Sequence, residues 1–144
     1  MPQKIISHSH PPPEVVVIPT YRNGSTPTVA PLEPLDLALL KEGISDEGNA
    51  CCVMLLFPTR FLYTDALGWL RYTGTHWTTK QAEAHVNRAI VTTLTRRIQA
   101  ALATGDPEKH DKLIKFCIPN KSRVTGAMYL LESLVTAYVD DFDA

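Results

Sequence analysis

The chain is organised around one stretch, Gly68-Trp69-Leu70-Arg71-Tyr72-Thr73-Gly74-Thr75-His76-Trp77. It contains both tryptophans of the protein and two of its seven glycines. Aromatic residues favour strands, and each aromatic segment here follows a glycine, which tolerates the backbone of a tight turn. The stretch therefore predicts a small twisted hairpin and not a helix.

The residues before this stretch complete the predicted β-element, which spans about 61–77. Phe61-Leu62-Tyr63 has the composition of a first strand, and residues 65–68 supply the turn before a second strand over 69–72. A second turn leads into residues 75–77 as a short third segment. A lone hairpin is only marginally stable, so we expect one of its faces to pack on helices.

The two faces of the second strand follow from its period of two. Trp69 and Arg71 fall on one face, and Leu70 and Tyr72 fall on the other. We expect Trp77 to be an anchor in the core. Stacking of an exposed tryptophan or tyrosine on a nucleobase is the alternative.

Helix signals flank the hairpin on both sides. A leucine-rich run over 35–40 ends at Gly43, a natural helix stop. Ser45 then caps a helix that has acids in its first turn and ends before Pro58. The longer predicted helices cover 45–57, about 80–104, about 107–117 and about 120–138.

The starts of the last three helices rest on capping chemistry. Thr78 or Thr79 is the predicted cap of the first of them. Asp106-Pro107-Glu108 supplies a cap, a proline at the first helical position and an early acid for the second. The third begins near Asn120 or Ser122 and has the clearest helical spacing of apolar residues in the chain.

The helix over 80–104 has two predicted faces and one exception. Its buried arc consists of Val86, Ile90, Leu94, Ile98 and Leu102. Its solvated stripe consists of His85, Arg88, Thr92, Arg96 and Gln99. Arg97 falls inside the apolar arc. Three roles stay open for it: reaching solvent from the edge, pairing with an acid such as Asp65 or Glu132, or facing a partner.

The predicted fold class is mainly α with a small β-hairpin or three-stranded element, that is, α+β. Residues 35–144 form a compact helical domain, and residues 1–34 form a flexible, disordered Pro-rich leader that holds eight of the eleven prolines. Val15-Val16-Val17-Ile18 is a β-prone exception within the leader, able to add as an edge strand to a sheet.

Composition limits the functions of the chain. Its 144 residues suffice for one domain, and its formal net charge of −1 excludes a uniformly basic surface. The charge is uneven, however, because residues 80–123 carry nine Lys or Arg against four acids. No apolar run is long enough to span a membrane and no signal peptide begins the chain, so we expect a cytoplasmic protein.

The cysteines and acids predict no catalytic site. Cys51, Cys52 and Cys117 lack the spacing of a disulfide framework or metal pair, and we expect them to be buried thiols. His8 and His10, with their His-Ser-His alternation, belong to a solvated tail, as do Asp140, Asp141 and Asp143. The chain has no glycine-rich phosphate-binding loop. We therefore expect no enzyme in isolation and no metal site; a deep pocket lined by Arg97, His85 and a carboxylate would be needed to revive an enzymatic hypothesis.

The best candidate functional surface is basic. Outward lysines on a short helix and at the start of the next suit contacts with phosphates, although an ordinary solvated helix face explains them equally well. The candidate nucleic-acid-binding residues are Lys109, Lys112, Lys115, Lys121, Arg123, Arg88 and Arg96.

The order of these features resembles a known family. Ser45-Asp46-Glu47-Gly48-Asn49-Ala50, the Gly68-Trp69 to Trp77 hairpin and the closing Val139-Asp140-Asp141-Phe142-Asp143 are similar to the helical segment before the helicase in phage and plasmid primases and poxvirus-type primase-helicases. The resemblance covers about residues 44–144. Its motif residues are Gly48, Asn49, Gly68, Trp69, Gly74, Trp77 and Phe142.

The resemblance implies a non-catalytic accessory or linker domain that supports helicase assembly and DNA engagement. It implies DNA, helicase or primase domains, or a second copy of the chain as partners, and no membrane. Family members continue into a superfamily-3 helicase, so ATP and Mg²⁺ are implied only for such a following domain, and this chain itself needs no cofactor. The alternative is a stand-alone protein-interaction module without DNA binding, which docks through the helix over 124–138 or through the Val15–Ile18 strand.

Overall fold

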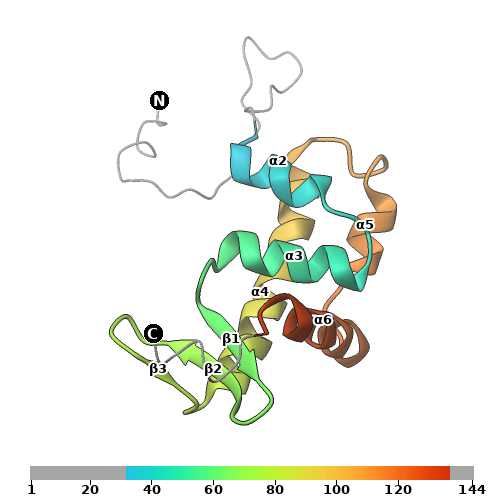
Figure 1. The fold of residues 1–144 in the computed structure, drawn as a ribbon. Helices are drawn as coiled ribbons and strands as arrows, with labels where there is room; N and C mark the ends of the chain where they lie inside the picture. Colours follow the sequence, from blue (N-terminus) through green and yellow to red (C-terminus); the bar gives the residue numbers. More distant parts are fainter. Residues whose placement is uncertain (1–31, 137–144) are drawn as a thin grey trace.

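The computed structural model describes residues 32–136, which form five helices and a three-stranded antiparallel sheet (Figure 1). In chain order the elements are α2 (Pro34–Lys41), α3 (Asp46–Leu56), β1 (Phe61–Thr64), β2 (Gly68–Tyr72), β3 (Trp77–Thr78), α4 (Ala82–Ala103), α5 (Asp111–Phe116) and α6 (Lys121–Leu134). The predicted α+β class is confirmed. The predictions for the leader over 1–31, for Tyr138 and for Phe142 lie outside the described residues.

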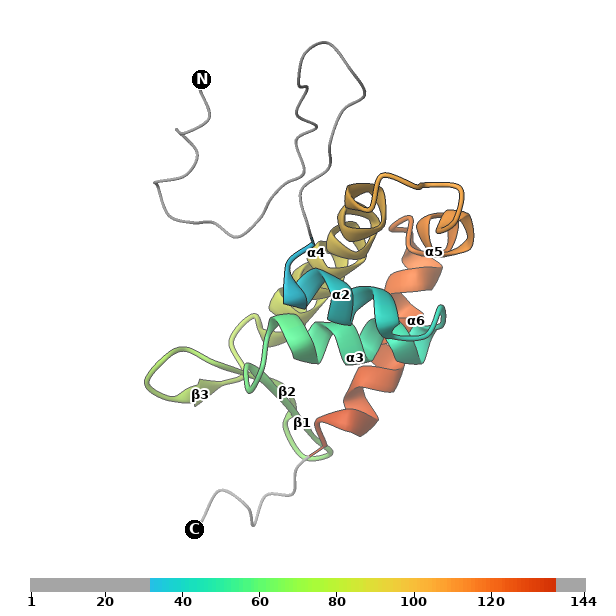
Figure 2. The ribbon, with the colours of Figure 1, turned by 90° about the horizontal axis from the view of Figure 1, so that it is seen from above.

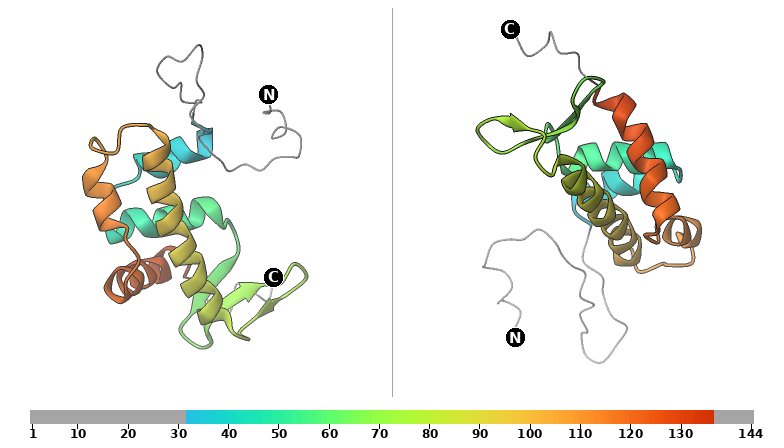
Figure 3. Two further views of the ribbon diagram at one scale, coloured as in Figure 1. Left: turned by 180° about the vertical axis from the view of Figure 1, so that it is seen from behind. Right: turned by 90° about the horizontal axis from the view of Figure 1, so that it is seen from below.

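Helix α4 is the axis of the fold. It contacts each of the other four helices and strand β2. Figure 2 shows α2 and α3 lying across α4 and α6. In Figure 3 the sheet sits at the end of the helical body where α4 begins. The core between these layers is a single cluster that includes Trp69 of β2, Val86 and Ile90 of α4, and Leu131 of α6.

The hairpin forms over the predicted residues. Phe61 lies opposite Arg71 and Thr64 opposite Gly68, and the Thr64 hydroxyl accepts a hydrogen bond of 2.9 Å from the Leu67 amide in the turn. Gly68 has a positive φ of 76°, a conformation that glycine adopts without strain. The turn between β1 and β2 therefore requires a residue of this kind at its end.

The two tryptophans have different environments. Trp69 is in the core and makes an edge contact with Tyr63, with ring centroids 5.2 Å apart. Trp77 was expected in the core, but it is only half-buried and pairs with Tyr72 at 5.1 Å. Strand β3 is the last strand of the sheet, and in its register Trp77 lies directly opposite Tyr72 of β2. Trp77 therefore packs against the hairpin itself.

The predicted buried arc of α4 is correct in its first half only. Val86, Ile90 and Leu94 are fully buried, whereas Leu102 is 52% exposed. A step of four residues advances 40° around a helix, so Leu102 lies about 160° from Val86. Ala101, which falls closer to the line of Val86, is buried in its place.

Two predicted helix starts are wrong. Helix α4 begins after Gln81, which has a left-handed φ of 54°, and not after a threonine cap. Helix α5 begins at Asp111 and not at Pro107. The amides of Lys109 and His110 bond to carbonyls three residues back, so this segment forms successive turns and not an α-helix.

The two remaining predicted caps are confirmed. The Ser45 hydroxyl accepts a 3.0 Å hydrogen bond from the Gly48 amide at the start of α3. The Asn120 side chain accepts a 2.8 Å bond from the Arg123 amide at the start of α6. Both bonds satisfy amides that the first turn of a helix leaves without a partner.

The Gly48 and Gly126 positions let α3 pack closely against its neighbours. A Cβ atom on Gly48 would collide with the backbone carbonyl of Gly43, and one on Gly126 would collide with the carboxylate of Asp46. Asn49 and Ala50 are fully buried. The Ser45–Ala50 motif is thus explained by capping and packing alone.

Arg97 takes none of the three roles that its sequence position left open. Its side chain is fully buried and has no carboxylate partner among the described residues. Its guanidinium donates to the backbone carbonyls of Leu39 (3.0 Å), Glu42 (2.7 Å) and Gly43 (3.1 Å), which end α2, and to the Asn49 side chain (2.7 Å). The C-terminus of a helix carries partial negative charge. Arg97 therefore caps α2 from the core.

None of the helices within residues 32–136 combines the length and the hydropathy that a crossing of a lipid bilayer requires.

Candidate functional site

The predicted basic surface at α5 and the start of α6 is exposed. Lys109, Lys112, Lys115 and Lys121 all lie at the surface. Lys115 pairs with Asp111 at 3.1 Å, one helical turn away. Both of these side chains are exposed, so the pair contributes little to stability. The four lysines therefore form an exposed basic surface.

Arg123, a predicted member of this surface, has partners within the fold. Its Nε donates a 2.8 Å hydrogen bond to the carbonyl of Phe116, and its guanidinium stacks 3.7 Å from the centre of the Phe116 ring. Its Nη1 lies 3.8 Å from Asp46. Arg123 therefore joins α5, α6 and α3, which is a structural role.

The predicted arginines on α4 differ from each other. Arg96 forms a 2.8 Å ion pair with Asp36 of α2, and both side chains are largely buried. Arg88 is exposed. Only Arg88 of this pair is thus available to a ligand.

A polar pocket of about 310 Å³ lies close to Arg88, between the sheet and the first turn of α4. Arg60 precedes β1, Arg71 and Tyr72 end β2, and His85 comes from α4. Phe61, Thr73 and Gly74 complete the lining, so none of the described residues that line this pocket is acidic. Arg88 does not line the pocket itself but a neighbouring hollow that also contains Glu83, and its charge acts on His85. We call Arg60, Arg71 and His85, together with the adjacent Arg88, the basic pocket.

The hairpin register and a backbone contact set the direction of Arg71. Its Nε donates a 2.9 Å hydrogen bond to the carbonyl of Lys80, in the segment between β3 and α4. This bond leaves the terminal nitrogens of the guanidinium for other partners. A guanidinium oriented in this way suits two parallel hydrogen bonds to a phosphate.

The electrostatics of the basic pocket show in the pKa of His85. Desolvation lowers this pKa below the usual value of 6.5, and the positive charges of Arg71, Arg88 and Arg60 lower it further. Three arginines thus act on one imidazole. A site with this concentration of positive charge favours an anion.

The pKa of His85 gives a first testable prediction. Arg88→Gln is expected to raise it toward 6.5, because one of the three repelling charges is removed. An NMR titration of the imidazole measures the shift. Lys112→Gln, an exposed change on α5, should leave the pKa of His85 unchanged and serves as the control. Equal titration of His85 in all three proteins would show that the arginines do not act on it.

The lowered pKa of His85 also makes the stability of the fold depend on pH. Because the folded pKa lies below the unfolded value, protonation of His85 favours the unfolded chain. The contribution of His85 to stability is therefore complete above pH 6.5 and declines as the pH falls below that value.

Aromatic side chains stand beside the arginines. Tyr72 lines the basic pocket and is 38% exposed, and its ring contacts that of Trp77. Proteins that bind single-stranded nucleic acids combine exposed aromatic rings with guanidinium groups. The bases stack on the rings, and the phosphates pair with the guanidinium groups.

The thiols offer no chemistry of this kind. Burial raises the pKa of Cys52 to about 12 and also raises the pKa of Cys117. Both thiols lie beside Arg97, where they donate to the Leu39 carbonyl and to the Asn49 side chain. A protonated, buried thiol is a poor nucleophile. The predicted burial is confirmed for Cys52 and Cys117, whereas Cys51 is only half-buried.

The enzymatic hypothesis required Arg97, His85 and a carboxylate around one pocket. His85 lies at the basic pocket, but Arg97 is enclosed in the core three turns further along α4. The structure does not bring these residues together. Within residues 32–136, moreover, no three His, Cys, Asp or Glu side chains are grouped as a metal site would need.

Sequence reasoning missed Arg60 and Arg71 as members of the site. Each precedes an aromatic residue at a strand end, in Arg60-Phe61 and Arg71-Tyr72. That repeated basic–aromatic pair was the available signal. The two pairs are adjacent in space only because β1 and β2 are antiparallel, with Phe61 opposite Arg71.

Comparisons of the chain with protein-family models, with curated proteins and with solved structures find no match.

Proposed function

We propose that this chain is a non-catalytic accessory domain of a DNA-replication primase-helicase, located in the cytoplasm, and that it engages DNA through the basic pocket. The observation that carries the proposal is the gathering of Arg60, Arg71 and His85 around one pocket beside the exposed ring of Tyr72. The order of the Ser45–Ala50 motif and the Gly68–Trp77 hairpin supports the family assignment.

Single-stranded DNA is the form that the pocket suits best. Arg60, Arg71 and Arg88 supply contacts to phosphates, and Tyr72 supplies a stacking surface for a base. The site contains no helix positioned to read a groove, and a stacked base of any sequence satisfies it. Binding is therefore expected to depend on salt and little on sequence.

The test compares two variants that remove equal charge. Arg60→Gln with Arg88→Gln removes two charges from the basic pocket, and Lys109→Gln with Lys112→Gln removes two from the α5 surface. All four side chains are exposed, so neither variant removes a core contact. Fluorescence anisotropy of a labelled oligothymidylate measures affinity over a range of salt concentrations.

The arginine variant is expected to weaken binding about tenfold, since each exposed guanidinium–phosphate contact contributes up to about 1 kcal/mol. The slope of log affinity against log salt should become less steep by about 1.4, because each phosphate contact on a single strand contributes about 0.7 and two contacts are lost. The lysine variant should change both quantities less. A larger loss in the lysine variant would assign DNA contact to the α5 surface and overturn the role of the pocket. No binding by the unchanged protein at low salt would overturn the function.

A protein-interaction module without DNA binding is the second candidate. An apolar hollow between α3, β1 and α6 favours it, because Met54 and Leu134 at this hollow are about 40% exposed. Light scattering that shows a mass rising with protein concentration, together with no affinity for oligothymidylate, would support this candidate over the first.

A further inference from the structure

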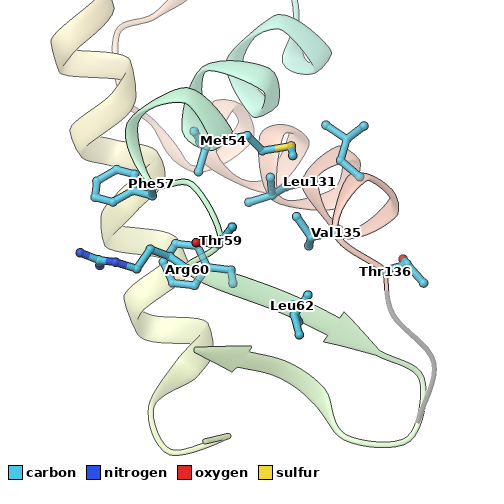
Figure 4. A pocket seen from close by; sticks show the side chains of 11 residues that line it. Met54, Phe57, Thr59, Arg60, Leu62, Leu131, Val135 and Thr136 are labelled. Atoms are coloured by element: carbon cyan, nitrogen blue, oxygen red, sulfur yellow. The ribbon is translucent and has the colours of Figure 1, made fainter. Parts of the chain in front are cut away.

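The apolar hollow lies on the opposite side of β1 from most of the basic pocket. Its volume is about 270 Å³, far more than the share of about 30 Å³ that one water molecule occupies in the liquid. Figure 4 shows Met54 from α3 with Leu131 and Val135 from α6 around this space, and Leu62 on the strand below. Such a hollow is a binding surface and not a packing defect.

The edge of β1 borders this hollow. Strand β1 is the first strand of the sheet, with β2 on one side only. The amide of Tyr72 donates to the carbonyl of Arg60, and in an antiparallel pair bonded and non-bonded residues alternate. The backbone groups of Phe61 and Tyr63 therefore point away from β2.

Part of this edge is already paired. The amide of Tyr63 donates a 3.1 Å hydrogen bond to the carbonyl of Val135, and Thr136 forms a parallel bridge with Tyr63. Because the bridge is parallel, residues 135 and 136 run in the same direction as β1, from its Phe61 end toward its Thr64 end. At Phe61 no backbone hydrogen bond on this side is formed within residues 32–136. An open edge beside an apolar hollow is a site for an added strand.

We propose that the segment Val15-Val16-Val17-Ile18 of the same chain docks here, adding a strand at Phe61 and placing its side chains in the apolar hollow. Valine and isoleucine have the highest strand preferences, and all four residues of the segment are of this type. Pro19 follows the run directly, and Pro13 precedes it with Glu14 between them. Proline cannot donate to a ladder, so the prolines limit the added strand to this short run.

The length of chain between the segment and the fold permits docking within one molecule. Thirteen residues, 19–31, separate Ile18 from Leu32, the first described residue. In an extended, proline-rich conformation they span about 40 Å. A domain of this size has a radius of gyration of about 13 Å, so the span of the connecting residues is comparable to the width of the domain. This inference does not depend on DNA binding.

The test compares two valine-to-aspartate changes in the leader of the full chain. Val16→Asp places a charge in the proposed strand, and Val29→Asp places the same charge outside it. Neither residue belongs to the described fold. Hydrogen exchange of the Phe61 amide, followed by NMR, reports whether the edge is covered.

The Phe61 amide is expected to exchange about tenfold faster in Val16→Asp than in the unchanged chain, and at the unchanged rate in Val29→Asp. Light scattering should give the mass of a monomer in all three proteins. Equal exchange rates in all three would overturn docking of this segment. Protection accompanied by a doubled mass would overturn docking within one molecule, since the strand would then come from a second copy.

Discussion

Replacement of Arg97 by leucine is expected to lower the free energy of unfolding by about 3–5 kcal/mol, the largest effect of any single change considered for this chain. The guanidinium makes four hydrogen bonds from a fully buried position, three of them to carbonyls that end α2. Leucine would leave the carbonyls of Glu42 and Gly43 without a partner, at about 1–3 kcal/mol each before relaxation. The Leu39 carbonyl and the Asn49 oxygen would keep only the weak thiol donors of Cys52 and Cys117. Chemical denaturation followed by circular dichroism measures the change.

Two further variants separate capping from charge. Arg88→Leu makes the same replacement at an exposed site on the same helix and should change stability by less than about 0.5 kcal/mol. Arg97→Lys keeps the charge but loses the planar set of donors, so we expect an intermediate loss of about 2 kcal/mol. A loss below about 1 kcal/mol for Arg97→Leu would show that the α2 carbonyls find other partners and that the capping role is wrong.

The second large effect is expected at Gly48. Alanine at this position would place its methyl group against the carbonyl of Gly43, a backbone atom that cannot move without shifting the chain between α2 and α3. Overpacking of this kind costs about 1–3 kcal/mol and occasionally more. The contact is with backbone, so we expect the upper end of this cost; less the gain in helix propensity of about 1 kcal/mol, Gly48→Ala should destabilise the fold by about 2 kcal/mol.

Gly126→Ala is the matched control for this change. Gly126 also lies within a helix, but its methyl group would meet the side chain of Asp46, which can turn aside. The gain of up to about 1 kcal/mol from replacing a helical glycine offsets much of that cost. Denaturation curves of the two variants should differ by about 2 kcal/mol. Equal stability would mean that the contact between Gly48 and Gly43 does not limit the packing of α3.

The Ser45–Ala50 motif could be explained from the sequence only in part. Ser45 as a cap follows from composition, because serine before acids at a helix start is a local signal. The need for glycine at position 48 and asparagine at position 49 does not follow. It comes from Gly43 and Arg97, which approach α3 only in the folded chain.

The candidate site, too, could be predicted from the sequence only in part. Arg88 was identified from its place on the solvated face of a predicted helix, and it lies at the basic pocket. Arg96 and Arg123 carry the same charge and have comparable sequence surroundings, yet each has partners within the fold. Net charge along the sequence does not distinguish a cation that binds a ligand from one that binds a carbonyl or a carboxylate.

The sequence by itself determined the hairpin, the α+β class and the caps at Ser45 and Asn120, because glycine turns, period-two alternation and capping side chains act over a few residues. Only the tertiary structure decided that Trp77 stays half-buried, that Arg97 caps α2 and that Arg60, Arg71 and His85 share one pocket. Each of these depends on contacts between segments far apart in the chain. Local patterns carry no information on which distant carbonyl or charge will be the neighbour of a given side chain.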